Sequence, residues 1–138
     1  MNIQKFTQKS IEAINGCEKL AYEYGNQEIE QEHLLVSLLL QEDGLIPKLV
    51  EKMEINLGHF TQNAQNRLAK RVKVSGGQIY MGQNLNKVLV SAEDEAKKMG
   101  DEYVSVEHLF LTLLKYPNPA MKEFFREYGL TRERFLQA

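Results

Sequence analysis

Cysteine is nearly absent from this sequence, so disulfide bonds cannot hold its fold. Cys17 is the only cysteine among 138 residues, and it has no partner within the chain. It falls on the apolar side of a predicted helix, where a thiol packs as a small hydrophobic group. The sequence therefore fits a reducing compartment, and Cys17 is expected to be structural rather than reactive.

A strong charge of either sign is also missing. Seventeen basic and nineteen acidic residues are mixed along the chain and leave a formal net charge of -2, so no uniform field attracts nucleic acid or an anionic membrane. Four cations do cluster at the end of a predicted helix, where they complement its C-terminus and where no aromatic residue interleaves for base stacking. They are Arg67, Lys70, Arg71 and Lys73. We expect no nucleic-acid partner and no membrane partner.

Long hydrophobic runs are absent as well. The longest, Leu34 to Leu40, is broken by Ser37 and is far too short to span a bilayer. The first ten residues, MNIQKFTQKS, lack the apolar core of a signal peptide. These absences predict a cytoplasmic location. The hydrophobic share of 43% and the charged share of 26% are ordinary for a globular chain of one compact domain.

The most informative pattern that is present is an internal repeat. At an offset of 75 residues, GNQEIEQEHLLVSLL from Gly25 aligns without a gap with GDEYVSVEHLFLTLL from Gly100. The Glu-His-Leu sequence that starts at Glu32 recurs at Glu107. Such a register predicts a duplicated supersecondary unit, and two copies are too few for a solenoid and should close into one globule.

The boundary between the copies is predicted at the segment KVSGGQIYMG, which holds the only Gly-Gly pair in the chain. Paired glycines mark the least regular backbone. We therefore predict one domain over 1–138, with repeat one at about 1–71, a linker at about 72–82 and repeat two at about 83–138.

Apolar residues in each half follow helical spacing. In repeat one the stripe is Ile11, Ile14, Cys17, Ala21 and Tyr24, and in repeat two it is Leu85, Val88, Leu89, Ala92, Ala96 and Met99. Steps of three and four residues place each set on one helix face. Thr7 is suited to cap the first helix, and Gly25 and Gly100 are suited to end the two long helices in the left-handed conformation.

Three shorter helices are predicted to follow in each half. The second is Leu-rich and begins near Glu32 or Glu107, with Ser105 as a cap; the fourth begins after the caps Asn56 or Thr131. The third is predicted over residues 45–53 and 119–128, where a proline suits the first turn. No strand is expected, because glycines interrupt the few β-branched residues of the linker. The predicted fold is all-α, with two pseudo-twofold-related four-helix repeats in one eight-helix domain.

The two Glu-His pairs are the first candidates for chemistry, because carboxylate and imidazole together can bind metal. Neighbouring residues point about 100° apart on a helix, whereas metal-binding pairs there usually lie three or four residues apart. Neither copy has a second ligand at that spacing. We expect no metal site, and interpret the glutamates as residues of the first helical turn, where the helix dipole favours them.

Catalytic motifs are not recognisable. The serines occur without a G-x-S-x-G or S-x-x-K frame, and no nucleophile lies in register with a base. The linker glycines lack the Lys-Ser/Thr of a phosphate-binding loop and follow no predicted strand. The sequence therefore predicts a non-catalytic chain. Its remaining feature is the seam between the repeats, where apolar grooves rimmed by polar side chains commonly form.

Together these motifs resemble the N-terminal domain of Clp-type AAA+ unfolding machines. The resemblance rests on Phe-Thr near the start, Glu-His-Leu in each repeat and Ser-Gly-Gly between the repeats, and it covers essentially the whole chain. The strings FTQKSIEAI, IEQEHLLVSLL, KVSGGQIY and LVSAEDEAKKMGDEYVSVEHLF look closest to the ClpB-type disaggregases and next closest to the ClpC type.

The resemblance implies a binding role without catalysis. In that family the domain precedes two ATPase modules, which are absent here, and collects unfolded or aggregated client proteins for ATP-driven threading. This segment is thus expected to bind no cofactor, and ATP and Mg to belong to the modules of a longer parent. The isolated domain is expected to be a monomer and the parent a hexamer.

The resemblance also implies substrate-binding residues. Thr7, Asp101 and Glu107 stand at the polar binding positions of the ClpB type, and Leu89 at a position of the apolar groove between the repeats. His108 and Ser91 occupy positions that can be leucine in that type, so His108 joins the predicted site and the groove is expected to be more polar.

An alternative follows from similarity to the ClpC type. There the two equivalent glutamates, here Glu32 and Glu107, hold the guanidinium of phosphorylated arginine, and adaptor proteins dock on the same domain. Both glutamates are present. They also stand at helix starts, and a carboxylate pair needs phosphate donors around it, so phosphoarginine binding stays the alternative to client binding.

Overall fold

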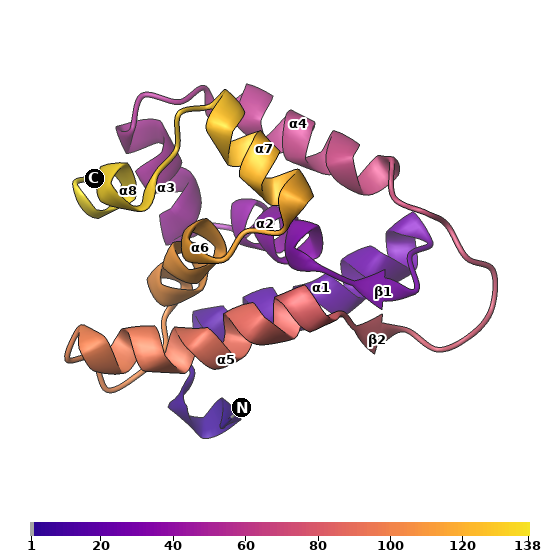
Figure 1. Ribbon diagram of the computed structural model, residues 1–138, viewed down its shortest axis with the longest axis horizontal. Coiled ribbons are helices and arrows are strands. Elements are labelled where there is room, and N and C mark those ends of the chain that lie inside the picture. The colour runs from indigo at the N-terminus through magenta and orange to yellow at the C-terminus, as the bar shows by residue number, and fades with distance from the viewer. Residues whose placement is uncertain (1) are drawn as a thin grey trace.

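The computed structural model describes residues 2–138, and helices dominate it (Figure 1). The elements are η1 Ile3–Lys5, α1 Gln8–Tyr24, β1 Glu28–Ile29, α2 Gln31–Leu39, α3 Leu45–Lys52, α4 Leu57–Ala69, β2 Tyr80–Met81, α5 Gln83–Lys98, α6 Val106–Lys115, α7 Pro119–Glu127 and α8 Arg132–Leu136. The predicted all-α class and the eight helices are confirmed within the described residues. The two strands, each two residues long, were not predicted.

The two halves repeat the same order of helices. At the offset of 75 residues α1 corresponds to α5, α2 to α6, α3 to α7 and α4 to α8. The last pair differs most, because α4 has 13 residues and α8 has five.

The predicted caps begin and end these helices as expected. Side chains of Thr7, Asn56 and Thr131 accept hydrogen bonds from backbone N–H groups in the first turns of α1, α4 and α8. Gly25 ends α1 with φ 72°, and Gly100 follows α5 with φ 73°. Side chains with a Cβ rarely adopt this left-handed conformation, which is why glycine stands at both positions.

The Leu-rich helices form the centre of the molecule. Every residue of α2 is buried, and so are most residues of α6. Aromatic rings then join the repeats, since the Phe60 ring of α4 lies 4.9 Å from Phe124 and 4.8 Å from Tyr128 between ring centroids. Such tilted and edge-to-face aromatic pairs contribute to stability beyond the area they bury. The core is therefore shared by the repeats rather than divided between them.

The segment just before the first helix of each repeat pairs with the segment just before the second helix of the other repeat. β2, just before α5, pairs in parallel with β1, just before α2. The same pairing recurs as a single bridge between Phe6, before α1, and Val104, before α6. The backbone N–H of Gly82 donates to Ile29 at 2.8 Å, and that of Thr7 donates to Val104 at 2.9 Å. Sequence patterns did not reveal these pairings, because each is one or two residues long and joins distant segments.

The Glu30 side chain links the two repeats beside the β1–β2 pairing. Its carboxylate accepts from the backbone N–H of Gln31 in α2, at 3.0 Å, and from that of Asn84 in α5, at 3.2 Å. α5 begins at Gly82, where an added Cβ would lie 2.0 Å from a Glu30 carboxylate oxygen. Because Gly82 has no side chain, the Glu30 carboxylate of the other repeat fits against it. That carboxylate caps α5 in place of a side chain at position 82.

Both histidines of the Glu-His motifs complete helix caps. The His33 Nδ1 accepts from the Glu30 backbone N–H and the His108 Nδ1 from that of Ser105, each at 2.9 Å. Nε2 of His33 lies 2.9 Å from the Asn26 amide oxygen, and Nε2 of His108 lies 2.8 Å from an Asp101 carboxylate oxygen. The histidine, rather than the glutamate beside it, therefore closes the first turn of α2 and of α6.

Replacing Glu30 by alanine is expected to lower the free energy of unfolding by about 2 kcal/mol, because two helices lose one cap acceptor each. Urea unfolding followed by circular dichroism measures the loss. Glu23→Ala, at an exposed position of α1, is the matched control and should change stability little. Equal effects of the two substitutions would contradict the double cap.

Substituting Asn26 by aspartate is expected to weaken the dependence of stability on pH. Burial, helped by the Arg71 guanidinium, lowers the pKa of His33 from 6.5 to about 4. Between those values the unfolded chain takes up a proton that the folded chain does not. The stability from neutral His33 is therefore complete above pH 6.5 and is lost toward pH 4. A carboxylate at Asn26, as Asp101 provides beside the other histidine, should raise the His33 pKa.

Urea unfolding at about pH 7 and about pH 4.5 tests this, with histidine ring shifts read by NMR. The Asn26→Asp variant should be less stable than wild type near pH 7 and should lose less stability on acidification. Burial raises the pKa of Glu30 and acts in the opposite direction, but that effect is common to both proteins and cancels in the comparison. Parallel stability curves for the two proteins would refute the interpretation.

Candidate functional site

The seam between the repeats contains an apolar hollow of about 110 Å³ between α1 and α5. Its lining residues are Ile14, Asn15, Cys17, Glu18, Ile29, Met81, Leu85 and Leu89. Leu89 thus lines the seam hollow, and Ile14, its counterpart at the repeat offset, lies in the same lining. The hollow therefore stands where the two repeats meet.

Accessible apolar surface in the seam comes from the edge of the hollow rather than from its floor. Leu89 is 1% exposed and Cys17 is 2% exposed, whereas Met81 of β2 is 39% exposed. Burial raises the pKa of the Cys17 thiol to about 12, so this thiol stays neutral and packs as a hydrophobic group. Met81 is therefore the most exposed apolar side chain of the hollow.

A second hollow continues the seam along α1. It has a volume of about 620 Å³, and its apolar lining residues are Tyr22, which is 80% exposed, and Ile79 of the linker. Asn15 and Glu18 line both hollows, so the two are neighbours along α1. We call this joint surface the seam groove. Its apolar groups are rimmed by polar side chains, which is the usual composition of a site for peptide side chains.

The predicted polar residues lie elsewhere, around the Phe6–Val104 bridge at the start of α1 and α6. Thr7 caps α1, Asp101 holds His108, and Glu107 is exposed in the first turn of α6. None of the four lines the seam groove. The structure therefore separates Leu89 from the predicted acidic rim.

His108 has little surface to offer a ligand. It is 3% exposed, and both ring nitrogens are within hydrogen-bonding distance of residues of its own repeat. Asp101 and Glu107 remain exposed. A ligand at this end of the molecule would therefore meet the two carboxylates and not the imidazole.

The two glutamates of the phosphoarginine alternative have unlike surroundings. The side chain of Glu32 is 4% exposed; its carboxylate accepts from Arg71 at 2.5 Å and from the Asn118 side-chain amide at 2.8 Å. Glu107 is exposed and makes no ion pair with the described residues. An internal guanidinium thus already occupies the first carboxylate, and only the second is open.

Two members of the basic cluster, which the sequence analysis assigned to the C-terminal end of a helix, have ion-pair partners in other elements. Arg71 bridges Glu28, at 3.1 Å, and Glu32. Arg67 pairs with Glu127 of α7 at 2.8 Å. Partly buried pairs of this kind join elements far apart in sequence, so both arginines are engaged in intramolecular ion pairs.

Gln31 is a further junction residue that sequence reasoning missed. It is fully buried, and its side-chain amide donates to the carbonyls of Asn84 and Tyr116, at 3.1 and 2.8 Å, while its carbonyl accepts from the Asn118 backbone N–H at 2.7 Å. Its counterpart in repeat two is Val106, so the repeat alignment gave no signal for this role. The Gln31 side chain therefore joins α2 to three backbone groups of repeat two.

Among residues 2–138 no three His, Cys, Asp or Glu side chains are grouped to hold a metal ion. Within the same range, no helix combines the length and apolar character needed to cross a membrane. The linker glycines lie in an exposed segment, and α5 begins without a Lys or a hydroxyl residue in its first turn. These residues therefore do not fit a nucleotide phosphate.

Comparison with known proteins gives one family. The model of the Clp repeat (R) N-terminal domain matches residues 5–128. The chaperone protein ClpB of Nitratidesulfovibrio vulgaris is 42% identical over 142 aligned positions, covering 99% of this chain and 16% of that protein. ClpB of Clostridium tetani is 33% identical, with 99% and 16% covered. The chain thus spans about one sixth of the length of these relatives.

Solved structures share the fold. The Hsp104 N-terminal domain of Candida albicans superposes with a TM-score of 0.83 at 23% identity, covering 95% of this chain and 86% of that one. The N-terminal domain of Escherichia coli ClpV1 gives a TM-score of 0.80 at 21% identity, with 98% and 83% covered. A ClpV N-domain in complex with a VipB peptide gives 0.75 at 18% identity, with 95% and 82% covered.

The family match, the ClpB relatives and the duplicated all-α architecture agree with one another and with the resemblance seen in the sequence. The chain belongs to the Clp N-terminal domain family.

Proposed function

We propose that this domain captures unfolded or aggregated polypeptide in the seam groove and presents it to AAA+ modules of a longer, ClpB-type chain. The observation that carries the proposal is the pair of neighbouring hollows along α1 that form the seam groove, with the apolar side chains of Met81 and Tyr22 exposed in them. Apolar segments are what a misfolded protein exposes and a folded one hides, so a shallow apolar groove distinguishes the two.

The parent protein supplies the chemistry in this proposal. ATP and Mg bind to the AAA+ modules in this proposal, as the similarity to ClpB suggests, and the linker glycines of this chain lack the Lys-Ser/Thr of a phosphate-binding loop. The similarity to ClpB, of which this chain spans 16%, supports such a parent. A cytoplasmic hexamer is proposed for the same reason, with the isolated domain as a monomer that contributes binding alone.

Thr7, Asp101 and Glu107 are proposed to act as a second, polar contact zone, with His108 positioning Asp101. The carboxylates lie away from the seam groove, so an extended client would reach both zones only by crossing the face between them. Leu89 is proposed to form the floor of the groove. Because it is 1% exposed, a charge placed there would disturb the core as well as the groove.

Met81→Glu is therefore the sharper test. It places a charge at the exposed edge of the groove and should lower affinity for an unfolded protein about fivefold, by desolvating a carboxylate against apolar client groups. Met99→Glu, at an exposed position after α5, is the matched control. Fluorescence anisotropy of a labelled, carboxymethylated and permanently unfolded protein measures both. Equal binding by the two variants would refute capture at the groove.

The alternative is docking of an adaptor protein or of phosphoarginine. The solved ClpV N-domain with a VipB peptide supports peptide docking on this fold, and the open carboxylate of Glu107 supports a guanidinium ligand. Backbone NMR separates the possibilities. A response centred on the seam groove supports client capture, a discrete patch elsewhere supports an adaptor, and shifts confined to Glu107 on adding free phosphoarginine support the modified residue.

A further inference from the structure

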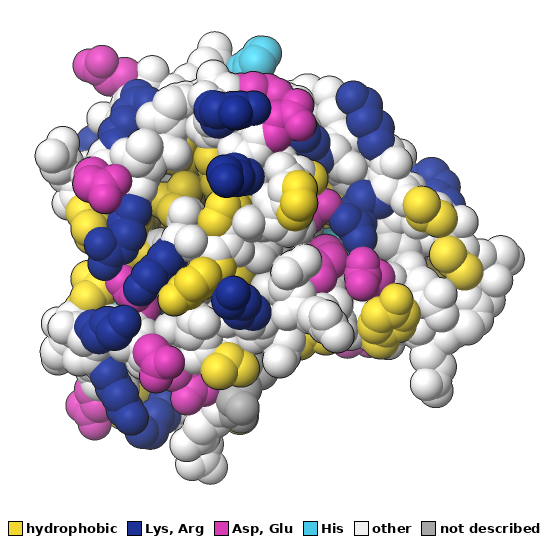
Figure 2. Space-filling model, viewed as in Figure 1, with side chains coloured by type: hydrophobic (Ala, Val, Ile, Leu, Met, Phe, Trp, Pro, Cys, Tyr) yellow, Lys and Arg dark blue, Asp and Glu magenta, His cyan; other side chains and the backbone are white. Residues whose placement is uncertain are grey.

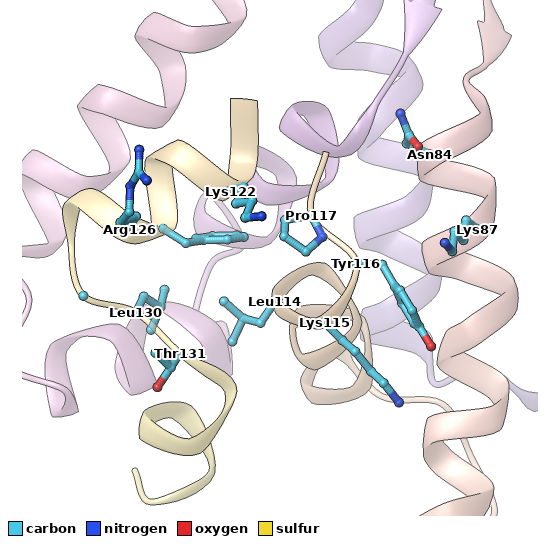
Figure 3. A pocket seen from close by; sticks show the side chains of 12 residues that line it. Asn84, Lys87, Leu114, Lys115, Tyr116, Pro117, Lys122, Arg126, Leu130 and Thr131 are labelled. Atoms are coloured by element: carbon cyan, nitrogen blue, oxygen red, sulfur yellow. The ribbon is translucent and has the colours of Figure 1, made fainter. Parts of the chain in front are cut away.

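Repeat two contains a hollow of about 700 Å³ that is separate from the seam groove (Figure 3). It lies between α5, α6, α7 and the segment that leads into α8. Its lining residues are Asn84, Lys87, Leu114, Lys115, Tyr116, Pro117, Lys122, Phe125, Arg126, Gly129, Leu130 and Thr131. None of them lines the seam groove. We call it the repeat-two pocket.

The floor of the repeat-two pocket is apolar. Phe125 is 4% exposed and Leu130 is 5% exposed, and both belong to the core. Leu114 and Pro117 are half-buried beside them. Figure 3 shows Leu114 and Leu130 facing the same space from α6 and from the segment before α8. Such a floor offers a place for one apolar side chain of a ligand.

The rim of the pocket is cationic. Its four charged residues are Lys87, Lys115, Lys122 and Arg126, and no carboxylate is among the lining residues. In Figure 2 Lys and Arg side chains gather around hydrophobic ones over α5, α6 and α7. This concentration stands out in a chain whose formal net charge is -2.

Most of these cations are available to a ligand. Lys115 reaches Glu95 at 3.6 Å, but that carboxylate also binds Arg132 at 2.7 Å. Lys122 and Arg126 are exposed and form no ion pair with any residue in the range 2–138. Lys87 has no ion pair within that range either, and its ammonium lies 4.7 Å from the centre of the Tyr116 ring.

The fold itself does not require these charges, because repeat one builds the corresponding helices without them. At the repeat offset the four cations correspond, in order, to Glu12, Leu40, Pro47 and Glu51. Two positions therefore carry the opposite charge in repeat one and two are uncharged. Because the helices of the repeat form without these cations, binding of a ligand explains the cationic rim better than a requirement of the fold does.

We propose that the repeat-two pocket binds an acidic peptide segment of a partner protein. One apolar side chain rests on Leu114, Phe125 and Leu130, and flanking carboxylates meet the free cations of the rim. The Arg126 guanidinium can hold a carboxylate by two parallel hydrogen bonds. Nucleic acid fits less well, because Phe125, one of the two aromatic lining residues, is 4% exposed and Lys87 covers the face of the other, Tyr116.

The test uses the whole chain and labelled peptides of about twelve residues, long enough to cross a pocket of this size. The first alternates glutamate with leucine; the second replaces each glutamate by glutamine; the third replaces each leucine by serine. Fluorescence anisotropy is measured at about 0.05 M and about 0.5 M NaCl, since salt screens exposed charge pairs. Heparin serves as a competitor without apolar side chains.

The variant is Lys122→Glu with Arg126→Glu, which reverses the two free cations on α7. The matched control is Lys48→Glu with Lys52→Glu, two exposed cations at the same spacing on α3, the counterpart of α7 in repeat one. Thermal unfolding checks that both double variants fold. Met81→Glu, made for the seam groove, separates the two sites.

The acidic leucine peptide should bind most tightly, and the α7 variant should lower its affinity about tenfold or more, an effect that salt weakens. The α3 control and Met81→Glu should leave its affinity within about twofold.

Equal binding of the glutamine peptide, or an equal loss in the α3 control, would overturn the proposal. Tight binding of the serine peptide or ready displacement by heparin would reduce the pocket to a plain anion site. Loss of binding in Met81→Glu alone would place the peptide in the seam groove.

Discussion

The reciprocal pairing of short segments between the repeats is the constraint on which the rest of the structure depends. Gly82 and Thr7 donate backbone hydrogen bonds to Ile29 and Val104 of the opposite repeat, and α5 and α1 begin immediately after them. Backbone pairing therefore fixes where both long helices start. Because these starts are anchored, α1 and α5 are held on either side of the hollow in the seam groove.

The two copies share this backbone scheme but use different side chains to secure it. Thr7 caps α1 with its own hydroxyl, whereas Gly82 leaves the cap of α5 to Glu30 of the other repeat. Asp101 holds His108, whereas the neutral Asn26 holds His33. Backbone geometry has thus been kept while the local charge has changed. The same freedom allows repeat two to carry four cations at positions where repeat one has two glutamates, a leucine and a proline.

Sequence reasoning succeeded where the determining interactions are local. Apolar spacing and capping residues such as Thr7 and Asn56 act within one or two helical turns, and the structure places them as predicted. It failed where partners are distant in sequence. Gln31 and the two strands depend on residues of the other repeat, and only the assembled fold reveals that Leu89 is buried. An apolar stripe identifies a helix face but not which of its residues reach solvent.

The way the seam groove is built bears on how it can bind. Its exposed contributors come from β2 and the solvent face of α1, while its floor belongs to the common core. A ligand can therefore occupy it without moving the core, so little of the binding free energy is spent on rearrangement. In the proposed capture of polypeptide, the apolar groups of the groove make few directional contacts, which favours low affinity and high tolerance for sequence. Accepting many polypeptides and releasing each of them, as that proposal requires, is served by this combination.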